Sequence, residues 1–190
     1  MKESLTFKLI SKLGIHLSSG EYSEISLLGA IKRALSSYVK TILLKYCMYS
    51  VFLSPLNFRI IRPFLWRVMG CKVGKKVFIG YSVWADVNNA KLIEIGNNVH
   101  ITNMCTLLCH QRDLSTYKIG DLSSKLPYVK KMIKIEDDVM IGMNSTILPG
   151  ITIGKGSIIG ANALVSKNIP PRVVASGNPI KIIRKINSVE

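Results

Sequence analysis

Acidic residues, aromatic residues and paired cysteines are all scarce in this chain of 190 residues. Only 11 Asp and Glu oppose 26 Lys and Arg, and the formal charge of +15 predicts an anionic partner, because net charge governs association rather than fold. Aromatic residues make up 7% of the chain and no reader motif is present, so we expect no nucleic-acid partner. The four cysteines form no CxxC pair, which argues against a zinc knuckle, a metal site or a disulfide framework.

A long uncharged apolar run is lacking as well. The most apolar stretch, residues 27–53, is interrupted by four basic residues, each of which costs about 2.5–3.5 kcal/mol near the centre of a membrane span. The first 15 residues carry four charges and lack the apolar core and cleavage site of a secretory signal. These patterns predict a cytoplasmic location, at most peripheral at the inner face of the membrane.

Residues 1–70 are predicted to form a basic amphipathic helical segment. Apolar residues recur at intervals of three or four from Leu28 to Leu53, Pro55 ends this helix, and a shorter helix follows from Phe58. The segment holds ten Lys and Arg against three Glu, which would suit contact with an anionic membrane. Packing of the apolar faces against the rest of the protein is the favoured interpretation.

The period changes to six after Gly70. Aliphatic residues, most of them followed by a small or acidic residue, recur at Val73, Ile79, Ile95, Ile101, Leu107, Ile135, Ile141, Ile147, Ile153, Ile159 and Val165. A period of six predicts a parallel β-helix, in which each hexad is a short strand and a turn. Residues 73–110 would form about two triangular coils and residues 135–170 another two. The fold class is therefore an all-β core with an N-terminal helical segment.

Residues 111–132 break the six-residue pattern. They contain Gly120, Pro127 and five basic residues, and a loop of this length in a compact domain is usually functional or disordered. We interpret it as a long inserted functional loop that overhangs a neighbouring subunit.

At these repeats the chain resembles the left-handed β-helix acyltransferases with hexapeptide repeats, which include galactoside, maltose and polysaccharide O-acetyltransferases. The resemblance is strongest over residues 135–186 and is specific in the tail GNPIKIIRK at 177–185. It implies a left-handed β-helix domain over 71–190 and a homotrimer with active sites between neighbouring subunits. It also implies acetyl-CoA as acyl donor and a sugar or glycan acceptor.

The resemblance further implies a catalytic histidine that takes the proton from the acceptor hydroxyl, work for which imidazole is suited. His110 ends the run TNMCTLLCH, where the coil gives way to the loop, and corresponds to the catalytic position. We expect His100 to be a surface residue, and His16 lies outside the resemblance. Cys109 is a rival nucleophile, but neighbours in an extended chain point to opposite sides.

Other site residues follow from the resemblance alone. The expected contacts of acetyl-CoA are with the pantetheine arm (Gly142, Met143, Ala161), the nucleotide end (Ser166, Lys167) and the phosphates (Lys181, Arg184). Asp86 and Asn89 fall where the family recognises acceptor hydroxyls.

These features predict an acetyl-CoA-dependent O-acetyltransferase that acts by direct transfer on a sugar hydroxyl, in capsule, exopolysaccharide or lipopolysaccharide synthesis. The segment LLCHQRD resembles the polysaccharide branch and favours this assignment. The alternatives are an N-acetyltransferase of amino sugars, a non-catalytic β-helix scaffold and an anionic-membrane-binding protein. A β-helical carbonic anhydrase would need three imidazoles, whereas two histidines lie on the coils.

Overall fold

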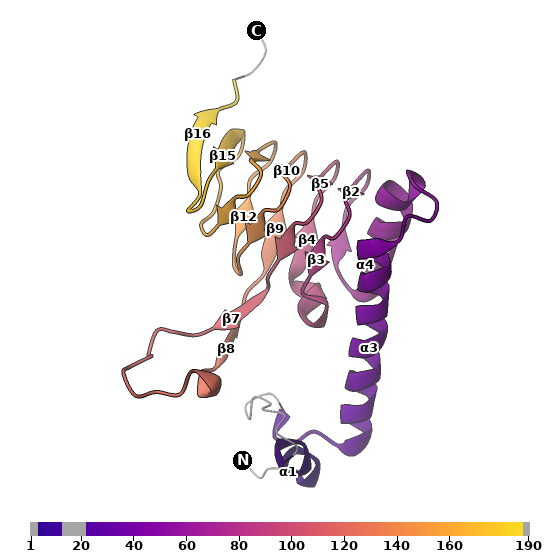
Figure 1. Cartoon of the computed structure of the whole chain (residues 1–190), viewed down its shortest axis with the longest axis vertical. Helices are drawn as coiled ribbons and strands as arrows, with labels where there is room; N and C mark the ends of the chain where they lie inside the picture. Colours follow the sequence, from indigo (N-terminus) through magenta and orange to yellow (C-terminus); the bar gives the residue numbers. More distant parts are fainter. Residues whose placement is uncertain (1–3, 13–21, 188–190) are drawn as a thin grey trace.

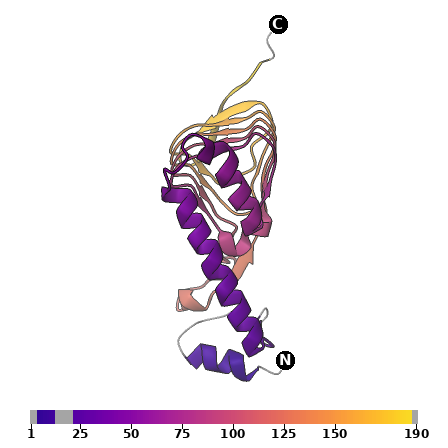
Figure 2. The same cartoon turned by 90° about the vertical axis from the view of Figure 1, so that its right-hand side faces the viewer.

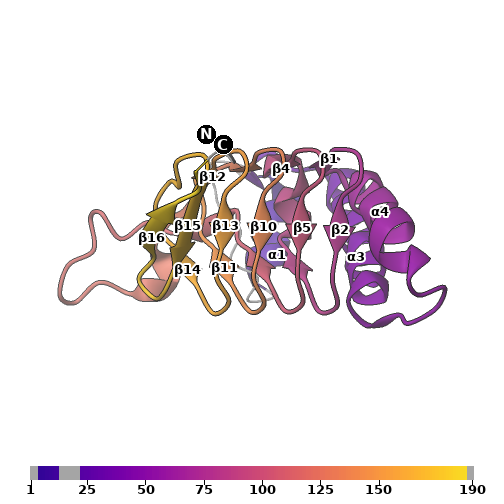
Figure 3. The same ribbon diagram turned by 90° about the horizontal axis from the view of Figure 1, so that it is seen from above.

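A triangular parallel β-helix forms the centre of the computed structural model, which describes residues 4–12 and 22–187 (Figures 1 and 3). Sheet A contains β1 (Lys72–Val73), β4 (Ile93–Ile95), β9 (Ile133–Ile135) and β12 (Thr152–Ile153). Sheet B contains β2 (Phe78–Ile79), β5 (His100–Ile101), β10 (Met140–Ile141), β13 (Ile158–Ile159), β15 (Val173–Ser176) and the antiparallel β16 (Lys181–Lys185). Sheet C contains β3 (Trp84–Ala85), β6 (Thr106–Leu107), β11 (Thr146–Ile147) and β14 (Leu164–Val165).

The interior of the β-helix confirms the six-residue pattern. Its aliphatic column is buried from Ile79 to Val165, and in-register parallel pairs such as Ile101 with Ile141 stack one coil on the next. Two coils precede the long insertion and two follow it, as the spacing predicts. Close stacking explains the glycine at 142, because a Cβ there would lie 2.5 Å from the Ala161 backbone nitrogen.

Two insertions leave the β-helix at the same corner, between sheet C and sheet A. The first is η2 (Val87–Leu92), which joins β3 to β4, and the second joins β6 to β9 one coil later. The second insertion is an arm that projects from the β-helix (Figure 1). It contains β7 (His110–Arg112), η3 (Ser123–Lys125) and β8 (Tyr128–Lys130). The predicted loop therefore has an antiparallel two-stranded base, and His110 is the first residue of that ladder.

The N-terminal segment is helical, and its later part, from residue 43 onward, covers the first coil (Figure 2). Its elements are α1 (Leu5–Lys12), α3 (Leu27–Tyr49), η1 (Asn57–Ile61) and α4 (Arg62–Met69). Helix α3 begins after Ser26, whose hydroxyl accepts a hydrogen bond from the Gly29 backbone nitrogen at 3.1 Å, and it ends before Pro55. Trp66 of α4 is fully buried against the β-helix core.

Arg62 is the charged residue at the centre of this end cap. Its guanidinium carbon lies 4.6 Å from the Phe58 ring centre and 4.5 Å from that of Tyr81, and Nη1 donates to the Ile79 carbonyl oxygen at 3.2 Å. Burial lowers its pKa, against nearby groups that favour the charged form. The cap thus closes the end of the β-helix with a hydrogen-bonded cation rather than with apolar side chains alone.

Helix α3 corrects one expectation from the sequence. It buries Leu44, Cys47 and Met48, whereas the apolar residues at the predicted three- and four-residue spacing are mostly exposed. Packing of α3 on the rest of the protein is confirmed, but of the predicted apolar face Tyr46 alone packs against the core. Among the described residues, no helix is long and apolar enough to cross a membrane.

Candidate active site

His110, Asp86 and Asn89 meet at the corner where both insertions begin. Asp86 directly follows β3 and His110 opens β7, and the coils stack in register, so the ends of β3 and β6 lie side by side. Asp86 Oδ2 contacts His110 Nδ1, and Asn89 Nδ2 donates a 2.9 Å hydrogen bond to the same Asp86 oxygen. Stacking of two successive insertions thus assembles a histidine with a carboxylate.

The carboxylate determines which His110 nitrogen carries the proton. The Asp86 side chain is 4% exposed and is therefore shielded from water, whereas the His110 side chain is 35% exposed and its ring is accessible to a substrate. An ionised carboxylate only accepts hydrogen bonds, which assigns the hydrogen of the neutral ring to Nδ1. Nε2 is left as the basic nitrogen, as a general base requires.

Asp86 and Asn89, which the resemblance assigns to the acceptor, contact His110 and each other in the structure. Asp86 is buried against His110, and Asn89 is bonded to Asp86. Their acceptor-binding role stays a prediction, and the contact that the structure provides is with the histidine. The six-residue pattern did not reveal this pairing, because β3, which precedes Asp86, has Ala85 where the strands of the pattern have a larger aliphatic residue.

The arm supplies a contact to His110 that sequence reasoning missed. The Tyr128 ring of β8 meets the His110 ring edge-on, with 5.3 Å between centroids, and the Arg112 guanidinium lies 3.9 Å from the Tyr128 ring centre. The pairing of Arg112 with Tyr128 across β7 and β8 creates this stack. Nothing in the hexad pattern places Tyr128 beside His110, because the arm lies outside the repeat.

Cys109 points into the core rather than toward the site. It is fully buried, and its sulfur lies 3.8 Å from the Leu92 carbonyl oxygen. Burial raises the pKa of the thiol to about 12, and the nearby Asp86 charge acts in the same direction. The expected opposite orientation of Cys109 and His110 is confirmed, and the thiol stays protonated near neutral pH.

His100 lies in a different environment, on the outer face of sheet B. Its ring stacks on Phe78 with 4.1 Å between centroids, and burial together with Arg59 lowers its pKa. His16 lies outside the described residues. No three His, Cys, Asp or Glu side chains gather as a metal ligand set in the ranges 4–12 and 22–187.

The residues expected to contact acetyl-CoA fall in three places. Gly142, Met143 and Ala161 stack at the corner between sheets B and C, where Met143 is exposed. The exposed Ser166 and Lys167 follow β14 at the corner between sheets C and A. The exposed Lys181 and Arg184 lie on β16, beside β15. The first group and His110 therefore flank sheet C from opposite sides.

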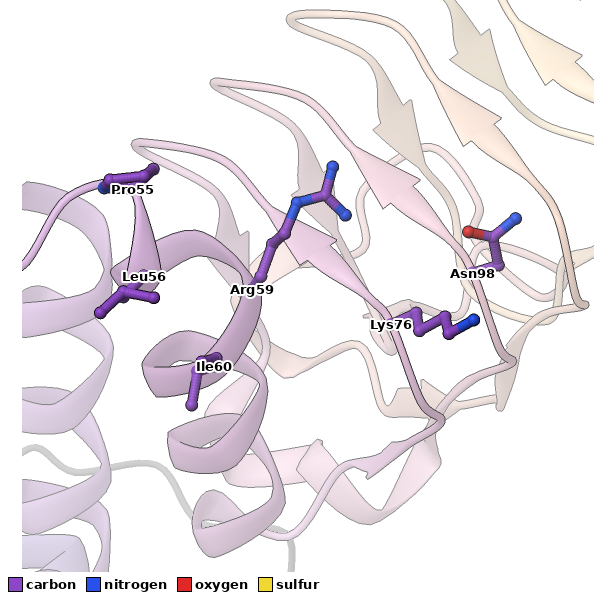
Figure 4. Close-up of a pocket in the computed structure, with 6 residues that line it drawn as sticks. All are labelled: Pro55, Leu56, Arg59, Ile60, Lys76 and Asn98. Atoms are coloured by element: carbon purple, nitrogen blue, oxygen red, sulfur yellow. The ribbon is translucent and has the colours of Figure 1, made fainter.

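A separate shallow pocket of about 460 Å³ lies at the N-terminal end of the β-helix (Figure 4). Its lining is Pro55, Leu56, Arg59, Ile60, Lys76 and Asn98. The side chains of Arg59, Lys76 and Asn98 extend over the outer side of the first turns, and Ile60 points elsewhere (Figure 4). This pocket is at the corner between sheets A and B, so it is distinct from the His110 corner.

Comparison with solved structures supports the architecture. A galactoside acetyltransferase in complex with coenzyme A aligns with a TM-score of 0.63 at 24% identity, over 90% of this chain and 92% of that chain. At this identity the similarity establishes the fold.

Sequence comparison identifies relatives. The chain is 44% identical over 119 residues to the Schizosaccharomyces pombe protein C18B11.09c, named as an acetyltransferase, over 60% of this chain and 53% of that protein. It is 38% identical over 120 residues to the galactoside O-acetyltransferase of Escherichia coli, over 60% of this chain and 56% of the enzyme. The chain thus spans about half the length of these two relatives.

Family membership rests on two findings. Residues 132–167 match the family model described as bacterial transferase hexapeptide (six repeats). The chain is also 34% identical over 142 residues to YvoF of Bacillus subtilis, named as an acetyltransferase, and this match covers 75% of the chain and 73% of YvoF. The chain therefore belongs to the hexapeptide-repeat transferase family, and its core is the left-handed parallel β-helix that the six-residue repeat predicts.

Proposed function

We propose that the chain is an acetyl-CoA-dependent O-acetyltransferase that acts on a sugar hydroxyl, within capsule, exopolysaccharide or lipopolysaccharide synthesis. The observation that carries this proposal is the contact of buried Asp86 with His110 at the corner where both insertions begin. The E. coli relative named as a galactoside O-acetyltransferase supports a sugar acceptor. The polysaccharide pathway rests on the segment LLCHQRD.

His110 acts as the general base in this proposal. Its Nε2 accepts the proton of the acceptor hydroxyl while that oxygen forms a bond to the acetyl carbonyl carbon. Asp86 stabilises the imidazolium that forms, and Asn89 holds the carboxylate in position through its 2.9 Å hydrogen bond. Acetyl-CoA supplies the acetyl group as an activated thioester. His110 then returns the proton to the departing sulfur, so that no acetyl group is held by the protein.

The surface on the other side of sheet C from His110 suits the donor. Coil stacking at Gly142 is so tight that a Cβ would meet the Ala161 backbone, which leaves backbone groups near the surface for the pantetheine amides. Lys181 and Arg184 provide exposed cations for the phosphates, where charge-assisted hydrogen bonds are strong. Lys167 adds a further exposed cation at the end of β14.

The same geometry supports a homotrimer with sites between subunits. The Gly142 group and His110 flank an open face of sheet C, which a neighbouring β-helix would convert into a cleft. The arm projects from its own β-helix and carries the exposed apolar residues Leu114, Ile119 and Leu122. Contact of this arm with a neighbouring subunit would bury those side chains.

Replacement of His110 tests the proposal. We expect His110→Ala to lower acetyl transfer from acetyl-CoA by about 10²- to 10⁴-fold, the usual contribution of a positioned base. Coenzyme A affinity, measured by calorimetry, should change little. His100→Ala is the matched control, because it removes an imidazole from sheet B, and Cys109→Ala should keep most of the activity.

The assay should offer a panel of galactosides, maltose and amino sugars, with product detection by mass spectrometry. Acetylation of amino groups alone would replace the O-acetyl assignment by N-acetylation. An active His110→Ala variant, or radiolabelled acetyl retained on the protein without acceptor, would contradict direct transfer through His110. Failure to bind coenzyme A would instead favour a non-catalytic scaffold.

A further inference from the structure

The N-terminal cap exposes a large apolar surface, which we call the cap surface. It consists of Leu28, Ile31, Leu35, Tyr38, Ile42 and Tyr49 of α3, Val51, Phe52, Leu53 and Leu56 of the connection, and Ile60, Phe64 and Val68 of η1 and α4. Each of these side chains is at least half exposed. Many exposed large apolar side chains on one part of a folded protein are typical of an interaction site.

The α3 part of the cap surface is a continuous stripe that faces away from the β-helix. Leu28, Leu35 and Ile42 follow one another at intervals of seven residues, which is close to two helical turns. The buried Leu44, Cys47 and Met48 lie on the opposite side of the helix, where α3 packs on the core. The stripe is therefore a second face, which the fold of this chain leaves uncovered.

The α4 part has the same arrangement. Phe64 and Val68 are four residues apart and exposed, whereas Trp66 and Met69 are buried against the β-helix. Helices α3 and α4 lie together at the end of the β-helix that precedes the first coil (Figure 3). Both therefore present apolar side chains at this end of the molecule.

Charge on this part of the chain has one sign. From Ile25 to Ala85 the sequence contains ten Lys and Arg and no Asp or Glu. Lys32 and Lys45 are exposed on α3, and by helical position they flank the stripe on its two sides. Arg59 and Lys76 are at the rim of the shallow pocket that also contains Leu56 and Ile60 of the cap surface (Figure 4).

We propose that the cap surface docks on an anionic lipid bilayer. An apolar helical face flanked by cations is the combination that inserts at the boundary of acyl chains and anionic headgroups. A second copy of this chain on the same surface would place basic residues against basic residues, with no carboxylate in the segment to oppose them. Arg59 and Lys76 provide cations for a lipid phosphate at the edge of the contact.

Vesicle flotation of the full-length protein tests this proposal, and it needs neither acyl donor nor acceptor. The vesicles are phosphatidylcholine alone, and equal parts of phosphatidylcholine and phosphatidylglycerol. We expect strong binding to the anionic vesicles that weakens as salt is added. The double variant Lys32→Gln with Lys45→Gln should bind them about 30-fold more weakly, since each basic residue near an anionic surface contributes a factor of about five.

Matched control variants distinguish binding through the cap surface from nonspecific electrostatic and nonspecific hydrophobic binding to vesicles. Lys118→Gln with Lys125→Gln removes two charges from the arm, and Ile183→Ser removes an exposed apolar side chain from β16, so neither should change binding. Ile31→Ser with Leu35→Ser should lower binding by at least about tenfold, because two half-inserted side chains are lost.

Equal binding to both vesicle types would overturn the proposal, as would unchanged binding by the Lys32 and Lys45 variant. Light scattering that detects pairing of molecules, abolished by Ile31→Ser with Leu35→Ser, would assign the cap surface to a second copy instead. The lysine variants alter exposed side chains, so they test the proposal even where the apolar variants fold poorly.

Discussion

Asp86 offers the sharpest test of how the site is built. His110 Nδ1 and Asn89 Nδ2 both contact the same carboxylate oxygen, and the Asp86 side chain is 4% exposed. In Asp86→Asn, an amide oxygen in that place still accepts both hydrogen bonds, so the tautomer is kept and the charge is lost. Asp86→Ala removes the acceptor as well, which frees His110 to adopt the other tautomer.

The two substitutions should therefore have different magnitudes. A hydrogen bond to a charged group contributes about 1.5–3 kcal/mol, and about 1.4 kcal/mol corresponds to a tenfold change in rate. We expect Asp86→Asn to lower kcat/KM by about 10- to 150-fold if the whole contribution is realised in the transition state. Asp86→Ala should lower kcat/KM by nearly as much as His110→Ala, about 10²- to 10⁴-fold, because an imidazole without a fixed orientation and tautomer is a poor general base.

Initial rates of coenzyme A release, with acetyl-CoA and the acceptor found in the panel, measure these effects. Glu94→Gln is the matched control, since it removes a carboxylate from the second coil that pairs with exposed Lys72. Asp86→Asn added to His110→Ala should cause little further loss, because Asp86 acts through His110. A further loss as large as that of the single Asp86→Asn change would refute the positioning role, as would full activity of Asp86→Ala.

Three further predictions concern the β-helix. Gly142→Ala should lower the free energy of unfolding by about 1–3 kcal/mol in a denaturant titration, because its Cβ would lie 2.5 Å from the Ala161 nitrogen; unchanged stability would contradict the tight stacking. Burial raises the pKa of Cys71 and Cys109 to about 12 from an ordinary 9.0. Between pH 9 and pH 12 the thiols therefore stay protonated in the folded state and lose their protons in the unfolded state. Their contribution to the free energy of unfolding is fully present below pH 9 and is lost as the pH rises toward 12, so the melting temperature should fall over this range. Replacement of either thiol by Ala should weaken that dependence. Light scattering should return about 63 kDa for three chains of 21.1 kDa, and a stable, active monomer would contradict sites between subunits.

The β-helix was predictable because its signal is repeated in every coil. An inward residue such as Ile141 must fit between those of the coils on either side, so its aliphatic character recurs with the coil. The pattern failed to show the third strand of the first coil. Ala85 occupies the inward position there, and η2 shifts the next aliphatic residue by four positions.

The site was predictable only in part, because its residues come from segments that interrupt the repeat. His110 was predicted from the family resemblance and its place at the end of the coil, whereas its contact with Asp86 depends on two insertions stacking at one corner. The contact with Tyr128 depends on the antiparallel ladder at the base of the arm. Neither contact has a period that a single sequence could reveal. The amphipathic pattern of α3 likewise predicts an apolar face and says nothing of what that face contacts.

Helix α3 connects the cap surface to the His110 site and leaves that site uncovered. Ser37 donates a 2.8 Å hydrogen bond to Asn88 Oδ1 in η2, next to Asn89, which is bonded to Asp86. Ser37 lies on the side of α3 opposite to Leu28 and Leu35, by its helical position. A bilayer that binds the stripe would thus contact the face of α3 that points away from η2. Docking at the cap surface is therefore compatible with an accessible His110.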